Sequence, residues 1–306
     1  MSAAEKAKTA INGILNINKP PCKTSQDIVA IIRRLSGQRQ VGHAGTLDPM
    51  ATGVLPVCLG QATRMSSYIM EFPKTYIAEI TLGISTDTYD AEGTITHEYD
   101  PYHINRVQIE ELIPSLTGRI MQKPPAYSAL KRRGRRLYEL ARAGIEVEID
   151  EREVEVHRLE LLDWQPPCFI IEVECGKGTY IRSLAHDIGQ SVACGAHISS
   201  LVRTTYGPFS IEESLTLPQL EDSFRNGYWQ ELLYPMDFAI QDWAVAIIDG
   251  EHKQAVLNGR PVQLHIDSDA NRCRAYSPEG ELIALLRIDL DTGLWQPDKV
   301  FHIKIK

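Results

Sequence analysis

One segment of the chain carries the periodicity of an amphipathic helix. Residues 24–36, TSQDIVAIIRRLS, repeat apolar side chains at helical spacing, at Ile28, Ile31, Ile32 and Leu35. Either Thr24 or Ser25 can accept a hydrogen bond from a first-turn N–H, and Gly37 is typical of a helix end. The pattern therefore predicts a capped helix over this segment.

Other segments have the patterns of strands. KTYIAEITLG, residues 74–83, alternates with period two and predicts a half-buried strand. GVLPVCLG, residues 53–60, is an apolar run of strand length. Residues 169–194 predict a strand, a glycine-containing turn and a helix, in that order. The turn-rich residues 85–96 predict a connection that leads to another short strand.

The remaining patterns predict short helices and a β-rich end. Three segments are predicted to be helical: 61–70, 106–118 and 135–144. Residues 41–56 follow the first helix and are predicted to be a loop. From about residue 241 the chain is predicted to consist of short strands, with a hairpin around 277–280 and no long helix after it. We therefore predict a boundary near residue 240.

Length and composition are those of a soluble globular protein. The 306 residues are 43% hydrophobic and 24% charged, enough for one large domain or two. No run of 18 apolar residues predicts a membrane span, and the first 21 residues lack the apolar core of a secretion signal. Six scattered cysteines without a CxxC pair indicate reduced thiols, so we expect a cytoplasmic protein.

The charge is unevenly distributed. The net charge is −8, which by itself argues against a nucleic-acid partner. Between Gly118 and Ala143, however, eight basic residues stand against one acid, Glu139. This block is basic enough to face phosphates. From charge alone, a solvated helix face is an equally good interpretation.

Common cofactor and metal signatures are absent. CGKGTY has Gly178 where a phosphate-binding loop has Ser or Thr after its lysine. No H-E-x-x-H motif and no Cys/His cluster has zinc spacing. The acids of DTYDAEG, residues 87–93, have the wrong intervals for a calcium loop. We expect neither a metal nor a nucleotide cofactor.

Asp48 is the residue that calls for an explanation. It lies in VGHAGTLDPMATGVLP, a stretch rich in Gly, Ala and Thr. Pro49 biases it toward an extended backbone, so its side chain can project from a loop. Gly42, Gly45 and Gly53 permit sharp reversals and the close approach of a ligand. An Asp-Pro turn and a chemical role are both compatible with this pattern.

A resemblance to a known family favours the chemical role. GHAGTLDPMATGVLPVCLGQATR resembles the catalytic-aspartate motif of the TruB family of tRNA pseudouridine synthases. NINKPPCKTSQDIV, KTYIAEITLGISTDTYDAEG, KPPAYSALK, GKGTYIRSLAHDIG and GPFSIEESLTL also match, in the family's order, over residues 12–240. AVLNGRPV is similar to the start of the family's PUA-like tail. Cys22 departs from the pattern, because the family often has glycine there.

The resemblance implies a fold and an activity. The fold is α+β, with a central, mostly antiparallel sheet flanked by helices and a small β-rich, PUA-like C-terminal domain. Residues 1–240 would form the catalytic domain, with an RNA-binding insertion at about 119–152, and residues 241–306 the tail. The activity is isomerisation of uridine to pseudouridine at position 55 in the T loop of tRNA. This reaction is redox-neutral, in agreement with the missing cofactor motifs.

The resemblance also implies catalytic residues. Asp48 is the essential carboxylate, which could attack C1′, add to C6 or take the 2′ hydrogen. Arg182 is expected to pair with it, lower its pKa and fix its orientation. Tyr76 is expected to stack on the uracil and to handle a proton after rearrangement.

Further residues are implied to bind the substrate. The target base must leave the T loop before reaction, and His43 is expected to fill the vacated stack. Tyr180 and Leu201 are expected to line the pocket, and Lys19 to hold the pocket or a phosphate. The basic block is expected to clamp the T-arm backbone; its arginines include Arg132, Arg133, Arg135 and Arg136.

Two other functions remain open from the sequence. An RNA-guided pseudouridine synthase shares the aspartate motif but works inside a guide-RNA particle. A noncatalytic tRNA-binding or tRNA-folding protein would share the binding surface. ISTDTYDAEG and the short tail favour a stand-alone synthase, and we expect a monomer that requires no protein partner.

Overall fold

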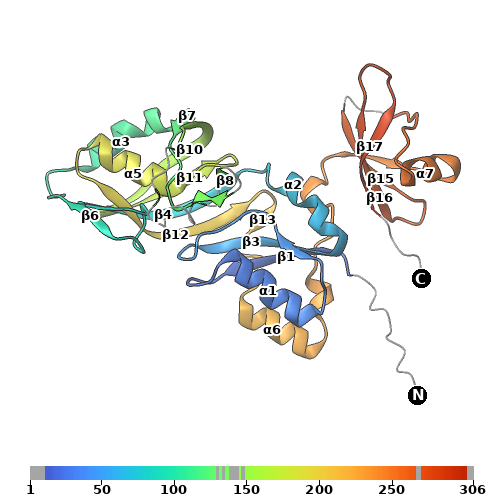
Figure 1. Cartoon of the computed structure of the whole chain (residues 1–306), viewed down its shortest axis with the longest axis horizontal. Coiled ribbons are helices and arrows are strands. Elements are labelled where there is room, and N and C mark those ends of the chain that lie inside the picture. Colours follow the sequence, from blue (N-terminus) through green and yellow to red (C-terminus); the bar gives the residue numbers. More distant parts are fainter. Residues whose placement is uncertain are drawn as a thin grey trace.

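A mixed sheet of nine strands forms the larger part of the computed structural model (Figure 1). The structure describes residues 11–128, 131, 132, 135–137, 145, 149–266 and 270–301. In spatial order the main strands are β1 (Gly13–Lys19), β3 (Thr52–Leu59), β12 (Ala196–Tyr206), β4 (Lys74–Leu82), β11 (Cys168–Cys175), β10 (Arg152–Gln165) and β7 (Gly118–Gln122). Two short strands extend it, β2 (Val41–His43) beside β3 and β13 (Phe209–Ser210) beside β12.

Neighbouring strands of this sheet are antiparallel, except at one junction. β3 and β12 are parallel and pair only through Val202 with Thr52 and Arg203 with Gly53. Gly53 is required at this junction, because it has φ +97° and a Cβ there would lie 2.2 Å from the Arg203 carbonyl oxygen. The predicted α+β fold with a mostly antiparallel central sheet is therefore confirmed, and the junction joins its two halves beside the Asp48 loop.

The first predicted helix is α1 (Ser25–Ser36), as expected. Thr24 is the N-cap and forms a capping box with Asp27, while Gly37 ends the helix at φ +66°. Ser25 has another partner: its buried hydroxyl accepts from the Leu47 N–H at 2.9 Å. The start of α1 thus fixes the residue before Asp48.

The other helices flank the sheet. They are η1 (Gly60–Met65), α2 (Ser66–Ile69), α3 (Arg106–Leu112), η2 (Ile113–Leu116), α5 (Ile181–Ser191), α6 (Leu217–Asn226), η3 (Trp229–Leu232) and η4 (Phe238–Ile240). α1 and α6 lie side by side below β1 and β3 (Figure 1). α5 packs against β12 and β4 at the other half of the sheet.

The structure corrects some of the predicted elements. The predicted loop 41–56 is shorter, because β2 and β3 take up both of its ends. β10, a 14-residue strand, was not predicted. Its first half lies in an acid-rich segment, residues 146–160, which contains seven acidic residues. Its residues alternate between buried and exposed, which is the twofold spacing of a strand. The exposed positions carry so many acids that the segment was noted only for its charge. In the predicted helix 135–144, Arg135–Arg136 form strand β9, and residues 138–144 lie outside the described part.

The C-terminal part is β-rich, as predicted. β14 (Ala244–Ile247), β15 (Arg272–Tyr276), β16 (Leu282–Ile288) and β17 (Trp295–Val300) form a separate four-stranded sheet at one end of the elongated molecule (Figure 1). The predicted hairpin lies between β15 and β16, where the Gly280 N–H donates to the Ser277 carbonyl. The helix α7 (Gly250–Leu257) was not predicted. The boundary near residue 240 stays a prediction.

Two further sequence-based expectations concern thiols and membranes. All six cysteines are free. Among the described residues, the helices are too short or too polar to cross a membrane.

Cys22 occupies a strained turn. Its φ is +60°, a conformation that costs an L-residue about 1–2 kcal/mol and a glycine very little. We expect Cys22→Gly to raise the free energy of unfolding by about 0.5–1 kcal/mol, because the greater freedom of glycine in the unfolded chain offsets part of the relief. Urea denaturation measures this, and Cys22→Ala, which keeps the strain, is expected to unfold like the wild type. Equal stability of all three proteins would contradict the strain.

Candidate active site

Asp48 lies in a loop whose backbone is tied on both sides. Leu47 is held by Ser25, and the Pro49 carbonyl accepts from the Cys22 N–H at 3.0 Å and from Lys19 Nζ at 3.1 Å. The Asp48 carbonyl accepts from the Ala51 N–H at 3.1 Å. The carboxylate is therefore carried by a fixed backbone, although it lies outside regular secondary structure.

Arg182 grips the Asp48 carboxylate with two nitrogens. Nε lies 2.9 Å from Oδ2, and Nη2 donates to Oδ1 at 3.2 Å. The Arg182 side chain is 5% exposed, while that of Asp48 is 33% exposed. This side-on, two-point contact fixes the plane of the carboxylate and leaves one side open to a ligand.

Asp90 is a functional candidate that sequence analysis missed. Its Oδ2 accepts from Arg182 Nη1 at 3.1 Å, and both side chains are 5% exposed. Thr88 Oγ1 and the Glu92 N–H donate to its other oxygen, Oδ1. Arg182 thus lies between two carboxylates, of which only Asp48 is open to a ligand.

The net effect of the surroundings is to favour the protonated form of Asp48. Burial raises the pKa of Asp48 and Asp90 raises it further, whereas Arg182 and Lys19 oppose this shift. Arg182 lowers this pKa, as expected, but its effect is smaller than that of burial. Desolvation outweighs the cation here, so ionisation of Asp48 depends on Arg182.

A pocket of about 370 Å³ opens beside the Asp48–Arg182 pair. The three predicted catalytic residues contribute to its wall: Asp48, Tyr76 and Arg182. Tyr180 and Leu201, which were predicted to line the pocket, do so as well. Tyr76 is on β4, Leu201 on β12, and Tyr180 immediately precedes α5. The structure thus brings together residues that lie up to 153 positions apart in the sequence, from Asp48 to Leu201.

Tyr180 is held by side chains that sequence analysis did not select. The Gln122 amide bonds both the N–H and the carbonyl of Tyr180, at 2.8 Å and 3.0 Å. The Arg152 guanidinium lies 4.9 Å from the Tyr180 ring centroid and also lines the pocket. Arg152 is therefore a further cation at the entrance, contributed by the acid-rich segment.

Lys19 is completely buried, and its ammonium group is fully used. Nζ donates to the carbonyls of Pro20, Lys23 and Pro49 at 2.9, 2.7 and 3.1 Å. Burial lowers its pKa to about 8, although Asp48 opposes the shift. Of its two expected roles, this geometry favours holding the pocket over contacting a phosphate.

His43 stands apart from the pocket wall. It is the last residue of β2, two positions before Gly45, which does line the pocket. Its Nδ1 is buried without a hydrogen-bond partner, and burial lowers its pKa. A neutral aromatic ring is suited to stacking on a base.

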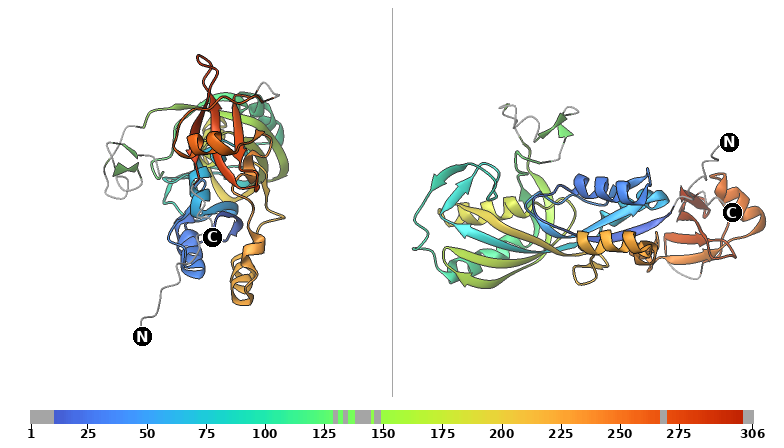
Figure 2. Two further views of the ribbon diagram at one scale, coloured as in Figure 1. Left: turned by 90° about the vertical axis from the view of Figure 1, so that its right-hand side faces the viewer. Right: turned by 90° about the horizontal axis from the view of Figure 1, so that it is seen from below.

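The basic block projects from the body of the molecule. Lys131–Arg132 and Arg135–Arg136 form the two-stranded ribbon β8–β9, drawn in green in Figure 2. The structure gives the backbone of Arg132, Arg135 and Arg136, whereas Arg133 lies outside the described residues. At its base, the Tyr127 carbonyl accepts from Arg182 Nη2 at 3.0 Å. The chain is thus tied to Arg182 at Tyr127, four residues before the ribbon begins.

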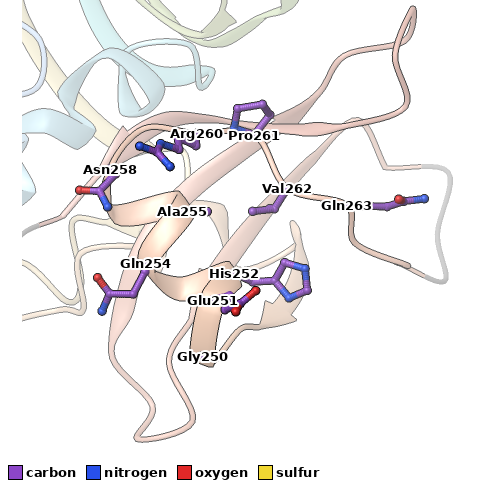
Figure 3. Close-up of a pocket in the computed structure, with 10 residues that line it drawn as sticks. All are labelled: Gly250, Glu251, His252, Gln254, Ala255, Asn258, Arg260, Pro261, Val262 and Gln263. Atoms are coloured by element: carbon purple, nitrogen blue, oxygen red, sulfur yellow. The ribbon is translucent and has the colours of Figure 1, made fainter.

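A second hollow lies in the C-terminal sheet. It measures about 650 Å³ and follows α7 and the residues after it. Glu251 and His252 lie at one end, and Asn258 and Arg260 at the other (Figure 3). It lacks a buried ion pair, so we assign the chemistry to the Asp48 pocket. Within the described ranges, no group of three His, Cys, Asp or Glu residues is placed to hold a metal ion.

Comparisons with known proteins show the family of this chain. Residues 33–181 match the model of the TruB family pseudouridylate synthase N-terminal domain, and residues 182–241 match the tRNA pseudouridylate synthase B C-terminal domain. The tRNA pseudouridine synthase B of Dehalococcoides mccartyi is 44% identical over 95% of this chain and 97% of the relative. That of Syntrophomonas wolfei is 42% identical over 96% and 99%.

Solved structures agree with the fold. A crystal structure of a Cbf5-Nop10-Gar1 complex superposes with a TM-score of 0.70 and 28% identity, covering 95% of this chain and 84% of that chain. An H/ACA RNP bound to a substrate RNA gives 0.71 and 26%, covering 95% and 85%. The class defined by fold and site is that of the pseudouridylate synthases, which are isomerases. Within that class, the chain belongs to the TruB family, and the predicted resemblance is confirmed.

Proposed function

We propose that this enzyme converts uridine to pseudouridine at position 55 in the T loop of tRNA, with Asp48 as the essential carboxylate. The main support is the Asp48 carboxylate, which is held side-on by Arg182 at 2.9 Å and 3.2 Å and opens into a pocket with Tyr76 on its wall. The sequence and the names of the relatives support tRNA as the substrate.

The reaction requires an ionised carboxylate beside the sugar. The glycosidic bond from N1 to C1′ breaks, the uracil turns, and C5 bonds to C1′; C5 then loses a proton and N1 gains one. Asp48 attacks C1′, adds to C6 or takes the 2′ hydrogen, and all three paths need its charge. Arg182 supplies that charge state against the desolvation of the pocket.

Base extrusion completes the proposal. The target uridine leaves the T loop, enters the pocket and packs between Tyr76 and Leu201, while His43 fills the vacated stack. The β8–β9 ribbon clamps the T-arm backbone, where positive charge contacts phosphates without reading sequence. The acidic net charge of the chain is compatible with this, since only one surface needs to be positive.

The stand-alone reading is favoured over the guide-dependent one. Relatives named tRNA pseudouridine synthase B share 42–44% identity over nearly the whole chain, against 26–28% for the Cbf5 and H/ACA structures. A tRNA-folding role without catalysis would not need the Asp48–Arg182–Asp90 arrangement. We further propose a cytoplasmic enzyme that acts as a monomer.

A defined substrate tests this function. Purified enzyme is incubated with an unmodified T-arm stem-loop, without other RNA or cofactor, and pseudouridine is located by nucleoside chromatography and primer extension after chemical labelling. We expect one pseudouridine per stem-loop, at position 55. A matched stem-loop with cytidine at position 55 is expected to give none. Absence of product despite tight binding would favour a guide-dependent enzyme or a tRNA-folding protein.

A further inference from the structure

Arg203 is a buried cation without an acidic partner. It is 1% exposed, and none of the ion pairs among the described residues includes it. Its Nε donates to the Val54 carbonyl at 2.7 Å, and Nη2 is buried with no hydrogen-bond partner. Burying a guanidinium with an unused nitrogen lowers the stability of a fold. The presence of such a group therefore suggests a role other than stability.

The surroundings of Arg203 are aromatic and belong to the active-site pocket. Nη1 lies 3.4 Å from the Tyr76 hydroxyl, to which it donates, and 3.5 Å from the Thr46 carbonyl. The guanidinium also lies 4.8 Å from the Tyr206 ring centroid. Arg203 and Tyr76 face each other in the register of β12 and β4, and both line the pocket with Asp48. The positive charge of Arg203, which no described carboxylate neutralises in an ion pair, thus lies next to the phenol of Tyr76.

We infer that Arg203 is a positioning residue that stabilises the Tyr76 phenolate, which removes the C5 proton in the last step of the isomerisation. This rests on the proposed function. In this step the C5–H bond breaks and its proton passes to the Tyr76 oxygen. The electron pair of that bond forms the C5=C6 double bond, the π pair of the C6=N1 bond moves to N1, and N1 takes a proton from solvent. Nη1, which donates to the Tyr76 hydroxyl at 3.4 Å, is placed to stabilise the oxygen as its charge develops.

The groups facing Tyr76 set the sign of the effect. Burial raises the pKa of Tyr76, and Asp48 and Cys175 raise it further, whereas Arg203 is the cation that opposes them. Without Arg203 the pKa of Tyr76 rises, so the phenolate becomes scarcer at neutral pH. The rate then falls at neutral pH and recovers about tenfold for each unit by which pH is raised, until the new pKa is reached.

Single-turnover rates with the T-arm stem-loop between pH 6 and 10 test this inference. Arg203→Met and Arg203→Gln are expected to react about 10- to 1000-fold more slowly at pH 7 and to approach the wild-type rate at high pH. Arg203→Lys keeps the charge and is expected to keep most of the rate. In the Tyr76→Phe background, which itself is expected to lose most turnover, Arg203→Met should cause no further loss.

Several outcomes would overturn the inference. A loss of rate that is independent of pH, or one that adds fully to that of Tyr76→Phe, would make Arg203 a structural residue only. A second measurement needs no Arg203 variant: 3-fluorotyrosine labelling makes phenols more acidic, and the rising limb of the wild-type profile should move to lower pH. If the rising limb of this pH–rate profile does not move, the Tyr76 phenolate is not the base in this step. If wild-type enzyme makes no pseudouridine, the proposed function itself fails.

Discussion

Asp48→Asn is expected to reduce the single-turnover rate of pseudouridine formation by at least about 10⁴-fold while leaving T-arm binding within a few-fold of wild type. Asparagine has the same shape but cannot carry the negative charge that all three chemical paths require. Its amide oxygen can still accept from Arg182, and Arg182 keeps Asp90 as a charged partner at 3.1 Å. The variant is therefore expected to fold, and the loss belongs to the chemistry.

The matched control removes the other carboxylate from the same guanidinium. Asp90→Asn also takes one charge from Arg182, but it leaves Asp48 facing the pocket. Because Asp90 raises the pKa of Asp48, its neutralisation favours ionised Asp48 and affects mainly the orientation of Arg182. We expect it to keep more than about one hundredth of the wild-type rate. Equal losses in the two variants would show that charge on the pair, rather than Asp48 itself, limits the reaction.

Wild-type turnover is expected to decline as pH falls through the raised pKa of Asp48, because only the carboxylate is active. This direction follows from burial, which outweighs the opposing effect of Arg182.

The sequence predicted the regular elements best where a single period governs a segment. α1 and β4 have one buried face each, so helical and twofold spacing are visible in their apolar residues. β10 follows the same rule, but its exposed face carries so many acids that the twofold spacing of its apolar residues was not recognised. α7 has almost no apolar stripe to detect, which is why a short polar helix in the C-terminal sheet was missed.

The candidate site was only partly accessible from sequence. Motif resemblance selected Asp48, Tyr76 and Arg182, which lie within long matching segments. Asp90 and Arg203 were not selected: Asp90 lies in a matching segment but was considered only as part of an incomplete calcium loop, and no motif pointed to Arg203. Their importance comes from burial and from the groups they face, and both depend on contacts between segments that are distant in sequence. A buried charge is recognisable only after the fold is known.

The position of Arg182 explains why removing it is expected to have the largest structural consequence. It donates to Asp48, Asp90 and the carbonyls of Thr88 and Tyr127, and so joins the reactive loop, the Asp90 turn and the base of the β8–β9 ribbon. Its charge compensates two carboxylates at once. A single side chain thus couples the ionisation of Asp48 to the segment that is proposed to hold RNA.

Arg182→Met is expected to slow turnover at pH 7 by at least about 100-fold and to destabilise the fold by about 3–5 kcal/mol. Asp48 then lacks the cation that opposes the rise of its pKa, so this pKa rises further in the folded state. A carboxyl whose folded-state pKa is raised binds protons more readily when folded, so the fold gains stability as pH decreases toward the unfolded-state value. We therefore expect the loss in free energy of unfolding to be largest at neutral pH and smaller at pH 5. Turnover should show the opposite trend, because it recovers as pH rises.

Urea denaturation at pH 5 and 7 and single-turnover rates from pH 6 to 9 measure these two opposite trends. Arg182→Lys keeps the charge but loses the two-point contact with Asp48, so it should retain stability better than activity. Arg225→Met, at a position 76% exposed, is the control for loss of an arginine and should change neither quantity. A deficit that is the same at both pH values would mean that Arg182 acts through packing alone. Opposite pH trends for stability and turnover would instead trace both effects to the ionisation of Asp48.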